Sequence, residues 1–214
     1  MMIAALLLLS APASTAIDAE LTFARDAKRI GQWSAFRKWA DKDAVMFTPQ
    51  AVWARDFLAN RKDPPRTVSW APAQSYVSCD GRTAVNTGPW FTQDNKLAGH
   101  FMTVWQRSRS GWRWVYDGGV PATAKSATRT TPKSVRASCS PPSSPPPIQA
   151  PPKLNPKQAL TTPQDNGRGQ SADATLGWDW KVTGKGERTF RVFLWNGTRF
   201  AQVIYGVDPA PPAK

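Results

Sequence analysis

The sequence predicts an α+β fold in which helices pack on one face of a curved antiparallel sheet. Two patterns support this prediction. Helix-like spacing of apolar residues fills much of residues 18–60, and from residue 67 apolar and polar side chains alternate as in half-buried strands. A third observation marks the end of this domain, because prolines crowd residues 120–164 and strand-like alternation returns only afterwards.

Residues 1–16 are expected to be a signal peptide. An apolar run rich in leucine is followed by small residues up to Ala16, although no basic residue precedes Arg25. The run is too short for a permanent membrane anchor, so we expect a mature chain from Ile17 that is periplasmic or secreted and has no stable membrane span. The alternative is a buried N-terminal helix.

Residues 17–119 form the predicted α+β domain. Apolar spacing predicts helices over residues 18–30, 33–40 and 51–60, with residues 44–47 as a short strand. Four antiparallel strands should follow, joined by short turns such as Asp80-Gly81. Their predicted ranges are 67–79, 82–92, 99–109 and 112–117.

Residues 120–164 are expected to be a linker rich in Pro, Ser, Thr and Lys, with extended polyproline-like stretches. Residues 165–214 then carry strand patterns between 176 and 207, which predict a three-strand β-meander with Asn196-Gly197 as a hairpin turn. Such a small unit rarely has a sufficient core, so we expect it to pack on the first domain or on a second copy.

The net charge of +13 suggests nucleic-acid binding, but the distribution of the basic residues argues against specific binding. Residues 118–164 hold six basic residues and no acidic one, so about half of the excess lies in the proline-rich segment. One histidine and two cysteines exclude a multi-histidine zinc site, and no phosphate-binding loop is present. We therefore expect no metal and no cofactor.

Cys79 and Cys139 are left with two interpretations. In an oxidising compartment they could pair and tether the linker to the first domain, closing a loop worth on the order of 4 kcal/mol. Two unpaired thiols are the alternative. Neither cysteine lies in a pattern typical of an activated thiol.

Residues 18–117 resemble the SnoaL-like branch of the nuclear transport factor 2-like superfamily. The resemblance is carried by residues 23–26, by residues 39–47, by the Asp80-Gly81 hairpin, and by residues 99–105 leading into 111–117. It implies a cone in which the sheet wraps around an internal pocket closed by the helices. Some members are isomerases, dehydratases or cyclases, and many only bind ligands or other chains.

An acid–base site in such a cone would need a general base and a polarising group. His100 and Asp117 are the candidate catalytic pair, since they lie on strands predicted to be neighbours; Asp43 and Tyr76 are further candidates. Strand parity alone does not say which face of the sheet looks inward.

The aromatic residues point to binding rather than catalysis, since a cone rich in indole would bind an apolar or planar small molecule. We expect a small hydrophobic ligand; the alternatives are a lyase or isomerase that uses the His–Asp pair, and a cell-envelope interaction module. A homodimer through the sheet is a further hypothesis. The candidate ligand-binding residues are Trp33, Phe36, Trp39, Phe57, Trp70, Trp90, Met102, Trp114 and Tyr116.

Overall fold

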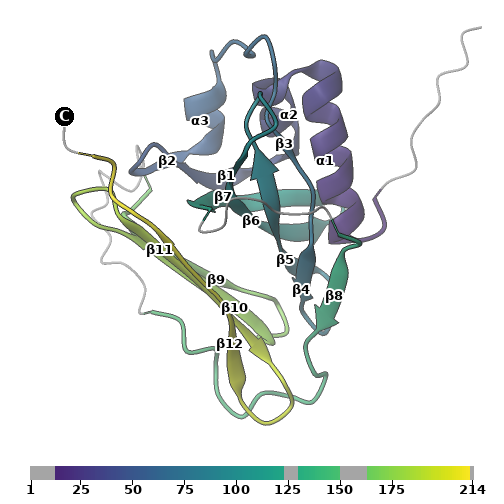
Figure 1. The fold of residues 1–214 in the computed structure, drawn as a ribbon. Helices are drawn as coiled ribbons and strands as arrows, with labels where there is room; N and C mark the ends of the chain where they lie inside the picture. Colours follow the sequence, from purple (N-terminus) through teal and green to yellow (C-terminus); the bar gives the residue numbers. More distant parts are fainter. Residues whose placement is uncertain (1–12, 123–129, 150–162, 213–214) are drawn as a thin grey trace, which may run out of the picture.

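The computed structural model describes residues 13–122, 130–149 and 163–212. Within these ranges the chain is α+β, with helices on one side of a large mixed sheet and a smaller antiparallel sheet on the other side (Figure 1). Residues 1–12 of the predicted signal peptide and parts of the predicted linker lie outside the described residues.

The first helix, α1 (Ala16–Ile30), begins at a capping box. The Thr15 hydroxyl accepts a hydrogen bond from the Asp18 amide at 3.1 Å, and the Thr15 amide donates to the Asp18 carboxylate at 3.0 Å. Gly31 then separates α1 from α2 (Gln32–Trp39) with a φ of +100°. A Cβ atom at Gly31 would lie 2.3 Å from the Asp63 carboxylate carbon, so the junction requires glycine.

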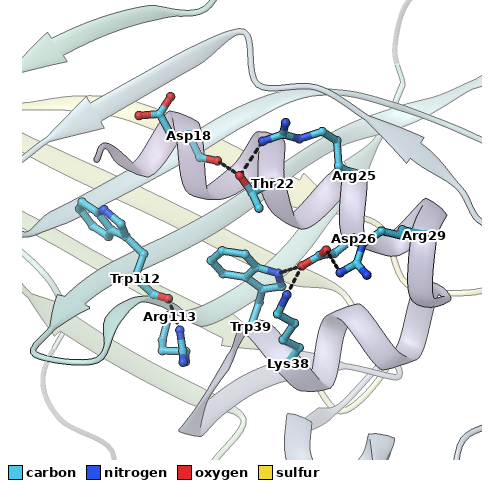
Figure 2. Close-up of polar contacts among 9 residues, drawn as sticks. All are labelled: Asp18, Thr22, Arg25, Asp26, Arg29, Lys38, Trp39, Trp112 and Arg113. Carbon is cyan, nitrogen blue, oxygen red and sulfur yellow. Dashed lines mark hydrogen bonds and ion pairs between the residues drawn. The ribbon is translucent and has the colours of Figure 1, made fainter. Parts of the chain in front are cut away.

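A buried carboxylate, Asp26, joins α1 to α2 (Figure 2). It accepts hydrogen bonds from the Trp39 indole at 2.9 Å, from Lys38 at 2.5 Å and from Arg29 at 2.8 Å. Burial alone would raise the pKa of Asp26, but these three donors outweigh it and hold that pKa below its ordinary value. The two helices are therefore fixed to each other as one layer.

The larger sheet has the strand order β2-β1-β7-β6-β5-β4-β8, with β3 paired to β5. It is mixed, because β1–β7 and β4–β8 are parallel, whereas the sequence predicted an antiparallel sheet. The strands are β1 (Ala40–Phe47), β2 (Ala51–Trp53), β3 (Ser69–Trp70), β4 (Gln74–Val77), β5 (Thr83–Phe91), β6 (Leu97–Ser108), β7 (Gly111–Pro121) and β8 (Lys133–Arg136).

Several predicted segments differ from the structure. The strand predicted over residues 67–79 is divided into β3 and β4, which both pair with β5. The predicted helix over residues 51–60 is confined to α3 (Ala54–Leu58), because residues 51–53 instead pair with β1 as strand β2. Residues 133–136 were predicted to be linker but form β8, which is parallel to β4. Backbone hydrogen bonds explain this last difference. The Lys133 amide donates to Ala73 O and the Ala137 amide donates to Val77 O, so backbone groups at the edge of β4 gain partners.

The C-terminal sheet has four antiparallel strands rather than the predicted three. Its order is β12-β11-β10-β9. The added strand, β9, contains Gly167 and Gly169, which lie against the indole rings of Trp180 and Trp178. A Cβ atom at either glycine would lie 2.2 Å from a ring carbon, so this close approach needs residues that rarely form strands. The strands are β9 (Asn166–Gln170), β10 (Leu176–Val182), β11 (Arg188–Trp195) and β12 (Phe200–Asp208).

The central strands of the larger sheet are buried on both faces. On one face, helix residues such as Phe23 pack with Trp105 and Trp114. On the other face, Val85 and Val104 pack with residues of the smaller sheet. That second face is thereby covered within one chain, so a homodimer through it would have to displace the C-terminal strands.

Cys79 and Cys139 form a disulfide that joins the end of β4 to the segment after β8. Beside the disulfide, the Ser138 amide donates a hydrogen bond to Trp195 O at 2.9 Å, so the same segment also contacts the smaller sheet. The bridge therefore links the larger sheet, the β8 segment and β11.

Replacing both cysteines with serine should lower the free energy of unfolding by on the order of 4 kcal/mol, because the bridge closes a loop across a sequence separation of 60. Urea denaturation monitored by tryptophan fluorescence measures the effect, and reduced wild type should unfold at the same midpoint as the double variant. An unchanged midpoint in both samples would contradict this role.

Glu20 fixes α1 to the sheet and is fully buried. Its two carboxyl oxygens accept hydrogen bonds from the indole of Trp70 at 2.8 Å and from that of Trp105 at 2.6 Å, and the Asn86 side-chain amide donates at 3.3 Å. Burial raises the pKa of Glu20 to about 8, against the lowering effect of these donors. Glu20 is therefore mostly a neutral carboxylic acid at pH 7.

The Glu20→Gln variant should show how stability depends on this proton. The folded state keeps its proton up to a pKa of about 8 and the unfolded state only to 4.5. Between these values the unfolded state binds fewer protons, so wild type loses stability relative to the variant as pH rises, by at most about 1.4 kcal/mol per pH unit. Denaturation at several pH values from 5 to 9 measures the difference. The exposed Glu187→Gln change is the control, and parallel curves for wild type and Glu20→Gln would contradict the burial.

Candidate functional site

A cavity of about 480 Å³ lies between α2 and the helix-covered face of the larger sheet. α2 supplies Trp33 and Phe36, while strands β1, β3, β5 and β6 supply the remaining rings. Its aromatic walls are Trp33, Phe36, Phe47, Trp70, Trp90 and Phe101.

The polar end of the cavity is formed by Asp117 and Thr103 on adjacent strands. The Thr103 hydroxyl donates to Asp117 Oδ2 at 3.1 Å. Burial raises the pKa of Asp117 to about 7, while the Thr103 hydrogen bond and the charge of Arg188 lower it by less. Asp117 can therefore exchange a proton with a bound molecule near neutral pH.

A β-bulge at Val115 decides that Asp117 faces this cavity. Trp105 pairs with Trp114 and Val104 pairs with Tyr116, which leaves Val115 as an extra residue in β7. The bulge reverses the alternation, so Tyr116 joins the core between the sheets while Asp117 follows Trp114 onto the helix side. A strictly alternating strand would place Asp117 on the opposite face.

The smaller sheet also contributes to the cavity, through Arg188 and Asp208. The Arg188 guanidinium donates to Asp208 at 2.9 Å and to Gly119 O, and it lies 4.3 Å from the centre of the Phe47 ring. Burial raises the pKa of Asp208, and Arg188 opposes this effect. Sequence reasoning missed both residues, because no pattern in the sequence shows that β11 and β12 reach a cavity of the first domain.

Tyr116 lies behind the polar end. Its ring stacks on Phe190 with 4.3 Å between the ring centres. The hydroxyl is buried and has no hydrogen-bond partner among the described residues, and burial raises its pKa. A Cβ atom at Gly118 would lie 2.9 Å from this hydroxyl, so a glycine in the cavity wall accommodates the ring.

The predicted catalytic pair of His100 and Asp117 is not brought together. Phe101 and Thr103 line the cavity, whereas Met102 and Val104 belong to the core between the sheets. His100 alternates with Phe101 and therefore lies on the face shared with Met102, opposite Asp117. The other two candidates, Asp43 and Tyr76, are also outside the wall of the aromatic cavity.

The nine predicted ligand-binding residues divide into three groups. Those that line the cavity are Trp33, Phe36, Trp70 and Trp90. Those that pack in or against the core on the helix side are Trp39, Phe57 and Trp114. Those that face the smaller sheet are Met102 and Tyr116.

A second cavity, of about 610 Å³, lies between β1 and β9. Its wall includes Asp41, Asp43 and the glycine-containing backbone of β9, and it continues to Pro163, which borders residues outside the described ranges. Its wall is more polar and holds four aromatic side chains against six in the first cavity, so we take the aromatic cavity as the candidate site for an apolar ligand.

No group of three or more His, Cys, Asp or Glu side chains in the described residues is placed to hold a metal ion. No helix in these ranges combines the length and apolar character that crossing a membrane requires.

Comparison with known proteins gives limited similarity. No protein-family model and no curated protein matches the chain. Among solved structures, one similar protein is assigned as an aromatic ring hydroxylase from Novosphingobium aromaticivorans, with 15% identity, a TM-score of 0.36, and coverage of 52% of this chain and 89% of that one. Another is assigned as a calcium/calmodulin-dependent kinase II association domain from Exiguobacterium sibiricum, with 15% identity, a TM-score of 0.35, and coverage of 50% and 90%.

The Arg188→Gln variant should raise the pKa of Asp117 further, because the guanidinium charge that now lowers it is removed. Carboxyl-carbon NMR with labelled aspartate follows the titration directly. Arg199→Gln, which changes an exposed arginine of the same sheet region, should leave the Asp117 signal unmoved. If Arg188→Gln also left it unmoved, the smaller sheet would not contribute to the electrostatics of the cavity.

Proposed function

We propose that the protein binds a small, largely apolar molecule with at least one ring or bulky apolar group. One observation carries this proposal: a cavity with six aromatic side chains in its wall and a few convergent polar groups at one end. Stacking and edge contacts with indole and phenyl rings favour such a ligand, while the polar end orients it.

The predicted resemblance to SnoaL-like proteins is consistent with this function. The order of helices and strands, and a cavity on the helix-covered face of the sheet, are what the resemblance implies. We infer a nuclear transport factor 2-like cone extended by a second sheet. A purely structural interaction module would need no such cavity.

Binding can be tested with N-phenyl-1-naphthylamine, an uncharged aromatic probe whose fluorescence rises in apolar surroundings. We expect saturable binding, weakened about tenfold by Ala98→Trp, because the new indole would occupy part of the cavity. Val135→Trp adds the same side chain on the exposed strand β8 and should leave the affinity unchanged. Equal affinity of the two variants would place the probe elsewhere.

Acid–base catalysis is a second candidate function, favoured by the proton exchange that Asp117 can perform near pH 7. The lyase or isomerase hypothesis would then use Asp117 without His100. Exchange of the α-protons of an uncharged cyclic ketone such as 2-indanone in D₂O, followed by NMR, tests this step. The protein should accelerate the exchange, and Asp117→Asn should abolish the acceleration; a variant as active as wild type would rule this role out.

We propose that the chain is exported and that its signal peptide is cleaved before the capping box of α1. Cleavage after Ala16 would remove Thr15, which caps α1, and Ala16 O, which accepts from Asn86 at 2.8 Å. We infer that cleavage follows Ala13, where Ala11 and Ala13 have the small-residue spacing of a signal peptidase site. The Cys79–Cys139 disulfide fits an oxidising compartment. The intact mass of the exported chain should correspond to a start at Ser14.

A further inference from the structure

We propose that the ligand of the aromatic cavity is an organic cation, an ammonium group with apolar substituents, and that the Asp117 carboxylate is its counter-charge. This inference rests on the proposed function and specifies the ligand class for the same cavity. It is drawn from the aromatic walls, the position of Asp117, and the contacts that already engage Arg188.

The walls of the cavity suit a positive charge with apolar groups. Three of the six aromatic residues are tryptophans, which attract cations most strongly through the faces of their rings. The rings come from separate elements: Trp33 from α2, Trp70 from β3 and Trp90 from β5. A compact ammonium ligand could therefore contact aromatic groups on more than one side.

Asp117 is the carboxylate in this wall that lacks a close cationic partner. Its described hydrogen bond comes from the neutral Thr103 hydroxyl, and no described Lys or Arg forms an ion pair with it. A neutral donor offsets only part of the cost of burying a carboxylate. A bound cation would supply the missing charge.

Arg188 does not make the cavity an anion site. Its guanidinium is paired with Asp208, bonded to Gly119 O and covered by the Phe47 ring. With Asp117 ionised, the two carboxylates and one guanidinium at this end sum to −1. An anionic ligand would have to lie close to both carboxylates.

The net charge of +13 opposes a cation at long range but not inside the cavity. At physiological salt the screening length is about 8 Å, so distant surface charges contribute little. Among the described residues, Arg188 is the one basic side chain in the cavity wall.

Proton binding by Asp117 should compete with the cation. The Thr103 hydroxyl from β6 and the Arg188 guanidinium from β11 act on Asp117, and Asp208 from β12 lines the same cavity. Beyond the effect of burial, the charge of Asp117 in turn raises the pKa values of Glu20 on α1 and of its neighbour Tyr116 in β7. Burial raises the pKa of Asp117 to about 7, so affinity for a permanent cation should rise between pH 6 and pH 8.

The test compares benzyltrimethylammonium with neopentylbenzene, its uncharged carbon isostere, by displacement of N-phenyl-1-naphthylamine from the full chain at pH 8. We expect the cation to bind about tenfold more tightly or better. Asp117→Asn should remove most of that preference, whereas Asp94→Asn, at an exposed carboxylate outside the cavity, should preserve it.

Each outcome separates the two proposals. If the isostere binds as well as the cation, the cation inference fails and the proposed function stands. If neither compound displaces the probe and the probe itself does not bind, both fail. The pH dependence of wild type tests the inference without any variant: tighter binding of the cation at pH 8 than at pH 6 supports it, and tighter binding at pH 6 overturns it.

Discussion

The Glu20 carboxyl group is the contact on which the arrangement of helices and sheet depends. It is buried at the centre of the interface and binds groups on three strands at once: Trp70 on β3, Asn86 on β5 and Trp105 on β6. Burying a carboxylate that forms no ion pair with a described Lys or Arg is costly, so the group is held mainly as the neutral acid. Since Trp70 is also a wall of the cavity, the same carboxyl group positions part of the candidate site.

The C-terminal sheet has a structural role and a role at the site. It covers the face of the larger sheet that the helices leave open, with Trp178, Phe190 and Val192 among the buried residues. A small sheet of this kind is not expected to be stable alone, and this shared core gives it the apolar burial that it needs. It also brings Arg188 and Asp208 to the cavity, so the polar end is assembled from both sheets.

Local sequence signals predicted much of the fold. α1 has a clear apolar stripe and ends before Gly31, and the Asp80-Gly81 turn joins β4 to β5 as predicted. β9 was missed because its glycines disfavour strands and are explained only by the indole rings packed on them. β8 was missed because its pairing depends on the distant edge of β4.

The candidate site was less predictable than the fold. Trp33, Phe36, Trp70 and Trp90 were expected in the wall because large aromatics had to be buried somewhere. The side of the sheet on which Asp117 lies depends on one extra residue in β7, Val115, and the alternation of apolar and polar residues in the sequence does not show it. His100 was a plausible partner for Asp117 until the pairing register placed the two on opposite faces. The register between distant strands therefore determines which side chains face the cavity, and the local sequence pattern does not.

Carboxyl-carbon NMR with labelled glutamate tests the central claim most directly, because the chain contains only two glutamates, Glu20 and Glu187. A buried Glu20 held by two indoles should titrate with a pKa of about 8, and its signal should be identified by its loss in Glu20→Gln. If the signal that disappears in this variant titrates near 4.5, Glu20 is solvated, and the docking of α1 that shapes the cavity is contradicted.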